Sequence, residues 1–204
     1  MTTSRSLDVS ALPVYSISSD APLWWGQLLL TFIEGSMFCI LIAMYFYYRL
    51  RLDMWPPPGT QLPHVLLPSI GVAVLVVSAL GSYWASEAAK EDNRRKMIFG
   101  LVFNIVLAFA FLAVRILEWR SLNFNWAADI HGSIVWAILA LHSLDLVADV
   151  AFTIVLLIYV AIGRYGPKQR LGVHVDSVVW YFIVLIWLPL YAVIYWGPRY
   201  VGAP

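Results

Sequence analysis

Five stretches of the sequence are long and apolar enough to cross a lipid bilayer. A spanning helix needs about 20 mostly apolar residues, because each helical residue adds about 1.5 Å and the hydrocarbon core is about 30 Å thick. The stretches that meet this requirement are residues 23–47, 65–86, 97–117, 128–163 and 175–197. They predict an all-α integral membrane protein, a bundle of five transmembrane helices. The fourth stretch would extend about 54 Å as a helix, so we expect it to tilt, bend or project into water.

Composition supports a membrane protein and excludes several kinds of site. Hydrophobic residues make up 61% of the 204 residues and charged residues only 12%, against about 25% charged in a soluble domain. The net charge of +1 gives no basic field for nucleic acid. Cys39 is the only cysteine, which excludes an internal disulfide and a thiolate cluster for zinc or iron–sulfur. We expect Cys39 to be a small core residue.

The polar connections between the apolar stretches predict the orientation. One face of the membrane would carry eight basic residues, namely Arg5, Lys90, Arg94, Arg95, Lys96, Arg164, Lys168 and Arg170. The other would carry five, namely Arg49, Arg51, Arg115, Arg120 and Arg199. Because basic loops stay in the cytoplasm, we predict a cytoplasmic N-terminus and a periplasmic C-terminus. Residues 1–23 would form an N-terminal extramembrane arm and residues 24–198 the membrane domain.

Four ionisable residues share one narrow stripe of the fourth predicted helix. Relative to His131, the helical angles are about 20° for His142, 320° for Asp145 and 0° for Asp149. An ionisable group in hydrocarbon costs at least about 2.5–3.5 kcal/mol, so the stripe should face protein, a cavity or water. The stripe could pack against the helices of another protein, form a proton or ion pathway, or bind a metal. A metal site needs carboxylates from several helices, and only Glu34 offers a further one, so we predict no metal.

Glu34 stands alone in the apolar segment "LLLTFIEGSMFCIL". It lies about ten residues, or about 15 Å, into the first predicted helix, near the middle of the bilayer. We expect its carboxyl group to be protonated or paired. Arg115 and Glu118 are three residues apart at the end of the third predicted helix, and we expect them to pair near the membrane interface. Neither a nucleophile with its base nor a phosphate-binding glycine loop is visible, so no catalytic residue is predicted.

Several motifs follow one another in order along the chain. The segment "IEGSMFCILIAMYFYYR" is followed by "WPPPG", then by Trp84, the turn "EDNRRK" and Glu118. This series resembles subunit III of the haem–copper oxidases, in the short bacterial form with five helices. Glu34 matches a family glutamate, Trp55 a family loop, and Trp84 and Glu118 the next two family helices.

The last two helices carry further matches and one departure. "ALHSLDL" resembles the family's "GFHGLHV", so His142 matches the first family histidine, whereas Asp145 replaces the second. "IYWG" at 194–197 matches the family's end and places Trp196. "VDSVVW" at 175–180 sets a register seven residues away from that of "IYWG", so no family role is carried over to Asp176.

This resemblance implies a non-catalytic subunit without redox centres of its own. It would be docked in a hetero-oligomer on the catalytic subunit I and on subunit II, which hold the haems and copper. It also implies structural phospholipids bound near the helix of Glu34, support for proton uptake and durability of the catalytic subunit, and a place in the bacterial plasma (inner) membrane. Two alternatives stay open: an accessory subunit of a nitric oxide reductase or quinol oxidase, and an independent proton or ion transporter that uses Glu34 and the stripe.

Overall fold

The computed structural model describes residue 17, residues 21–164 and residues 166–200. Most of the predicted N-terminal arm, residues 1–16 and 18–20, lies outside the described residues. The helices are α1 (Pro22–Arg51), α2 (Leu66–Lys90), α3 (Arg94–Ser121), α4 (Ile130–Ala161) and α5 (Pro167–Tyr191), with α5 continued by η1 (Ala192–Trp196) and α6 (Gly197–Tyr200). Within the described part, five helices are long and apolar enough to cross a membrane. The predicted all-α class and the five predicted spans are confirmed.

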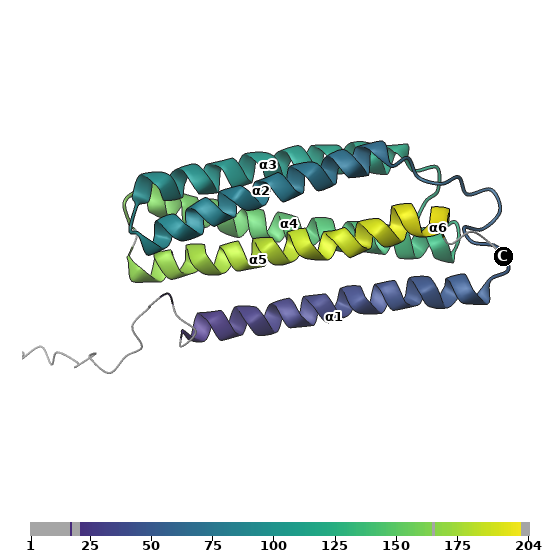
Figure 1. The fold of residues 1–204 in the computed structure, drawn as a ribbon, viewed down its shortest axis with the longest axis horizontal. Helices are drawn as coiled ribbons and strands as arrows, with labels where there is room; N and C mark the ends of the chain where they lie inside the picture. The colour runs from purple at the N-terminus through teal and green to yellow at the C-terminus, as the bar shows by residue number, and fades with distance from the viewer. Residues whose placement is uncertain (1–16, 18–20, 165, 201–204) are drawn as a thin grey trace, which may run out of the picture.

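The five long helices run alongside one another, and each reverses the direction of the one before it (Figure 1). One end of the bundle therefore gathers the start of α1, the end of α2, the start of α3, the end of α4 and the start of α5. We call this the N-terminal end of the bundle. Helices α2 to α5 pack on one another, while α1 lies on one side and contacts α4 and α5.

Helix α1 is far less buried than the rest of the bundle. Only 11% of its most apolar window is buried, against 33–39% for the other four helices. Its buried side chains are those of Phe38 and Tyr45. Because a helix this apolar needs lipid or protein around it, most of the surface of α1 is left for lipid or for another subunit.

Helices α2 and α3 form a tight hairpin. The turn places Asp92 at a positive φ of 56°, and Asn93 caps α3 by accepting a hydrogen bond from the backbone N–H of Lys96. Further along, the helices touch backbone to backbone: a Cβ on Gly100 would lie 2.7 Å from the carbonyl oxygen of Gly81. Small residues at such a crossing allow close helix approach in membranes.

Polar side chains in the interior are paired between helices. The indole N–H of Trp180 donates to Ser78 Oγ at 2.8 Å, which ties α5 to α2. The amide of Asn104 donates to Ser82 Oγ at 3.0 Å, which ties α3 to α2. Hydrogen bonds of this kind hold apolar helices in a fixed register, because burial in lipid alone does not distinguish one helix face from another.

The end of the fifth span departs from a regular α-helix. Pro189 lies inside α5, and the chain from Ala192 to Trp196 forms a π-helical turn before α6. Proline removes one backbone donor from the helical ladder, and a local π turn is one way in which a membrane helix satisfies the backbone groups that proline frees. The prediction of a span at 175–197 included no such interruption.

Candidate functional site

The four residues of the predicted stripe on α4 lie in three different environments. His131, His142 and Asp149 are buried, and Asp145 is partly buried. Figure 1 shows α4 running between α5 and α3, so different neighbours meet the stripe at different heights. The structure brings Asp145 and Asp149 together with Glu34, but it leaves His131 and His142 in two separate aromatic clusters.

His131 lies in an aromatic cluster at the end of the bundle opposite the N-terminal end. Its ring centroid is 5.0 Å from that of Trp55, 5.2 Å from that of Phe124 and 6.2 Å from that of Tyr45. The cluster joins α1, the loop after it and the start of α4. Asp129, two residues before His131, caps α4: its Oδ1 accepts a hydrogen bond from the backbone N–H of Gly132 at 2.7 Å. This arrangement anchors the loop that contains Trp55.

His142 lies near mid-depth among aromatic rings and a buried ion pair. Its Nε2 is 3.1 Å from the carbonyl oxygen of Ile183, and its ring centroid is 4.5 Å from that of Trp187. The guanidinium of Arg115 lies 4.0 Å from the centroid of the same tryptophan ring. Arg115 also donates to Glu118 Oε2 at 2.8 Å.

The predicted pairing of Arg115 with Glu118 is therefore present, but it lies inside the protein. Both side chains are buried, at 1% and 4% exposure. A surface pair of this kind adds little to stability, whereas loss of one partner from a buried pair leaves a charge without compensation. The spacing of three residues correctly predicted the pair, but nothing in the sequence indicated that both side chains would be completely buried.

The acidic groups meet in a cavity of about 300 Å³ between α1, α4 and α5. Glu34 enters it from α1, and Asp145 and Asp149 enter it from α4. The other residues that line the cavity are Leu23, Gln27, Leu30, Ala148, Phe152, Val179 and Ile183. We call this hollow the acidic cavity.

A fourth carboxyl group lies directly behind the acidic cavity. Thr153 Oγ1 is 2.9 Å from the carbonyl oxygen of Asp149 and donates to Asp176 Oδ1 at 2.9 Å. Asp176, to which the sequence analysis assigned no role, is 1% exposed. Within the described chain, Asp145 Oδ2 and Asp149 Oδ2 have no hydrogen-bond partner. No group of three or more metal-ligating side chains in those residues is placed to hold an ion.

A second hollow lies along another face of α1. It is an apolar groove of about 830 Å³, lined by Leu28, Thr31, Phe32, Gly35, Ser36, Cys39 and Ile40 of α1 and by Ile186 of α5. We call it the apolar groove. The expectation that Cys39 is a core residue is wrong: its side chain is exposed and lines this groove. A lipid-facing residue and a core residue are equally apolar in a membrane protein, so hydropathy did not separate them.

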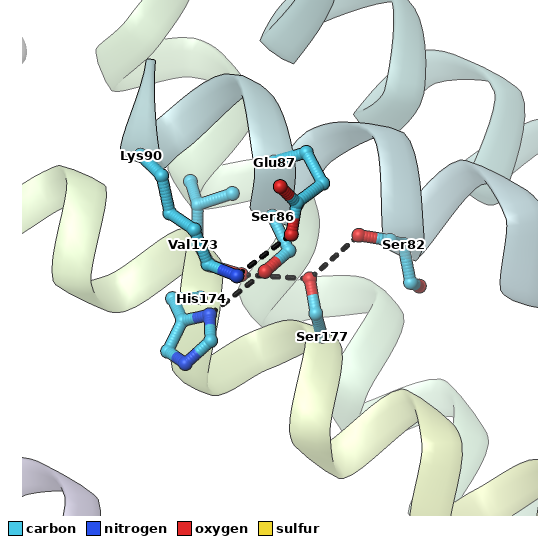
Figure 2. A network of polar contacts seen from close by, with 7 residues as sticks. All are labelled: Ser82, Ser86, Glu87, Lys90, Val173, His174 and Ser177. Atoms are coloured by element: carbon cyan, nitrogen blue, oxygen red, sulfur yellow. Dashed lines mark hydrogen bonds and ion pairs between the residues drawn. The ribbon is translucent and has the colours of Figure 1, made fainter. Parts of the chain in front are cut away.

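The N-terminal end of the bundle carries a polar network between α2 and α5. Figure 2 shows His174 of α5 directed at Ser86 of α2, and its Nδ1 lies 2.7 Å from Ser86 Oγ. Ser177 Oγ donates to the carbonyl oxygen of Ser82 at 2.9 Å. The ring of His174 also stacks on Trp24 at 5.8 Å between centroids. This network ties α1, α2 and α5 together at the N-terminal end of the bundle.

The remaining residues matched to the oxidase family occupy different places in the fold. Trp55 is buried, at 7% exposure, whereas Trp84 and Trp196 lie partly at the surface, at 38% and 36%. Trp84 packs against Phe103, with ring centroids 5.3 Å apart. The structure therefore places two of the matched tryptophans where they could face lipid or another chain.

The family model for cytochrome c oxidase subunit III matches residues 15–198. Cytochrome c oxidase subunit 3 of Gallus gallus is 29% identical over 143 residues, which cover 70% of this chain and 55% of that protein. The subunit 3 of Carassius auratus is 28% identical over 180 residues, which cover 84% of this chain and 68% of that protein. The match to the bird protein thus spans about half of its length. The family match extends over all five long helices, and the chain belongs to the cytochrome c oxidase subunit III family.

Proposed function

We propose that this chain is a non-catalytic subunit III of a respiratory haem–copper terminal oxidase, in a short bacterial form. The observation that carries the proposal is the family match over residues 15–198, which includes every long helix of the bundle. In this proposal residues 24–198 form the membrane domain in the bacterial plasma membrane. The N-terminus is cytoplasmic and the C-terminus periplasmic.

The partners in this proposal are the catalytic subunit I and subunit II, which hold the haems and copper. The low burial of α1 supports docking on another membrane subunit, because the other four long helices already bury one another. The chain's own contribution is helix surface, bound lipid and buried acidic groups. Electron transfer and oxygen reduction take place in the partner subunits.

The apolar groove beside α1 is our candidate for the structural phospholipid. Its residues offer aliphatic, aromatic and small side chains over one face of a helix, and its volume of about 830 Å³ is large enough for part of an acyl chain. An acyl chain gains contacts in a concave apolar surface that it does not make with other lipid tails. Lipid held here would lie on the face of α1 next to α5.

Glu34 is our candidate for the residue that supports proton uptake and the durability of the catalytic subunit. It is the acidic residue of α1 that reaches the acidic cavity, and it matches the family glutamate. Its position on the least buried helix places it closer to a docked neighbour than Asp149 or Asp176. A change at Glu34 can therefore affect the partner without disturbing the core of this chain.

Deletion and replacement of the chain test the proposed function. Oxidase purified from cells without the chain should keep its haems and its initial rate of oxygen consumption but should lose activity sooner during continuous turnover. Restored expression of the chain should restore the lifetime. Equal lifetimes with and without the chain would contradict the supporting role.

A further inference from the structure

The acidic cavity gathers more carboxyl groups than its surroundings neutralise. Glu34, Asp145 and Asp149 line it, and Asp176 lies behind Thr153. Neither lysine nor arginine lines the cavity, and none of the four carboxyl groups takes part in an ion pair among the described residues. We propose that these four residues form a proton-binding site, in which the carboxyl groups share protons and exchange them with water at the N-terminal end of the bundle.

Burial and missing partners favour the proton as the ligand. Asp149 is 7% exposed, lines the cavity, and within the described chain its Oδ2 accepts no hydrogen bond. A buried carboxylate without a cation or donors is far more costly than a neutral carboxylic acid. When several such groups lie together, ionisation of one opposes ionisation of the next. The step is binding of a proton from water to a carboxylate oxygen, which forms one O–H bond and leaves hydroxide or buffer anion in solution.

Metal binding does not account for the cluster. The four acids lie on three helices, yet no three metal-ligating side chains in the described residues converge on one point. Divalent cations such as calcium require six to eight oxygen ligands at short distances. The lining of the cavity instead mixes carboxyl groups with apolar side chains such as those of Phe152 and Val179. Such an environment favours neutral carboxylic acids over carboxylates.

The cavity provides a route from the N-terminal end of the bundle. Along α1 its lining begins at Leu23, in the first turn of the helix, and ends at Glu34. The eleven-residue step from Leu23 to Glu34 corresponds to about 16 Å along the axis. Gln27 lies between them and offers an amide on the way. Trp24, the chain neighbour of Leu23, stacks on His174 of α5.

The opposite direction is closed by aromatic side chains. His142, one turn beyond Asp145 on α4, is the next ionisable group, and it is completely buried among Phe38, Phe111 and Trp187. The guanidinium of Arg115 from α3 lies 4.0 Å from the centroid of that tryptophan ring. The other ionisable groups at the cluster are Glu34 on α1 and Asp176 on α5. His174, nearer the start of α5, stacks on Trp24 and bonds Ser86. The route along the bundle axis therefore ends at these aromatic side chains.

Infrared spectroscopy of the purified full-length chain in nanodiscs tests this proposal. The wild-type chain should show a carboxylic acid C=O band at neutral pH, and the band should shift in D₂O. Asp149→Asn, Asp145→Asn and Glu34→Gln should each remove part of it. Asp53→Asn changes an exposed carboxylate in the loop after α1 and should leave the band unchanged. Three separate substitutions keep the test valid if one variant does not fold.

The entrance is tested by the rate of the D₂O shift. Gln27→Trp should fill the route and slow the exchange, whereas Leu29→Trp, which places the same indole at an exposed position of α1 outside the cavity lining, should not. Absence of a carboxylic acid band at neutral pH, or a band that none of the three substitutions changes, would overturn the proton site. Equal exchange in the Gln27→Trp and wild-type chains would overturn the entrance. Because the isolated chain is used, these outcomes do not depend on the oxidase assignment.

Discussion

Helices α2 and α3 approach each other backbone to backbone where Gly81 meets Gly100. Substitution of Gly100 tests this close crossing, and other glycines of the chain serve as controls. A Cβ on Gly100 would lie 2.6 Å from the backbone nitrogen of Ala85, 2.7 Å from the carbonyl oxygen of Gly81 and 3.0 Å from Ala85 Cα. All three are backbone atoms, so no side chain can rotate away. Gly100→Ala must push the two helices apart.

The size of the effect follows from two opposing contributions. Overpacking of one methyl group in a close-packed interior costs about 1–3 kcal/mol. Replacement of glycine by alanine inside a helix returns about 0.5–1 kcal/mol through the lower entropy of the unfolded chain. We therefore expect Gly100→Ala to lower the free energy of unfolding by up to about 2.5 kcal/mol, with a central value of about 1 kcal/mol.

Two further glycines calibrate the measurement. A Cβ on Gly26 of α1 meets nothing within 4 Å, so Gly26→Ala should leave stability unchanged or raise it by up to about 1 kcal/mol. A Cβ on Gly71 meets only side chains, and the nearest is Phe111 Cε2 at 3.3 Å. The change in stability caused by Gly71→Ala should therefore lie between those of Gly26→Ala and Gly100→Ala. The assay is unfolding of the purified chain in mixed detergent and SDS micelles, followed by circular dichroism. Equal stability of the Gly100→Ala and Gly26→Ala chains would refute the close crossing.

Three other substitutions probe the interior and the proposed role. Arg115→Met should lower the free energy of unfolding by about 3–5 kcal/mol because Glu118 is left buried and unpaired, and the double variant with Glu118→Leu should recover most of that loss in the same micelle assay. Thr153→Val should lower the free energy of unfolding by about 1–3 kcal/mol because Asp176 loses its hydrogen-bond donor, whereas Thr153→Ser should lower it less. Equal losses of stability in the two variants would show that the hydroxyl group does not stabilise the fold. Glu34→Ala should leave assembly of the oxidase intact but shorten its lifetime during continuous turnover, and a wild-type lifetime would remove the proposed role of Glu34.

The sequence predicted the helices well because their cause is local. A run of about 20 apolar residues is sufficient for a spanning helix, and the ends of α1 and α3 are set by nearby features such as Pro22 and the Asn93 cap. The predicted span at 128–163 was longer than the 32-residue α4, because the Asp129 cap and the turn at Gly163 set its limits. The order of motifs also identified the family.

The partners of the polar residues could not be predicted in the same way. Helical angles placed His142 and Asp149 on one face, but the neighbour that each one meets depends on how α1, α3 and α5 cross α4. Those crossings depend on close contacts such as that of Gly172 of α5 with Leu156 of α4, which a single sequence does not reveal. Asp176 was visible as an acidic residue in an apolar span, but its bond to Thr153 requires the packing of α5 on α4.

The central claim is that this chain serves as a docked subunit without redox centres of its own, and purification of the tagged chain from its own membranes tests it most directly. In mild detergent, we expect a much larger haem-bearing polypeptide and oxygen-consuming activity to co-purify with the tag, and the chain separated from that complex to show no haem or copper absorbance. Haem bands in the separated chain, or a tagged chain that purifies with no haem-bearing partner, would contradict the account.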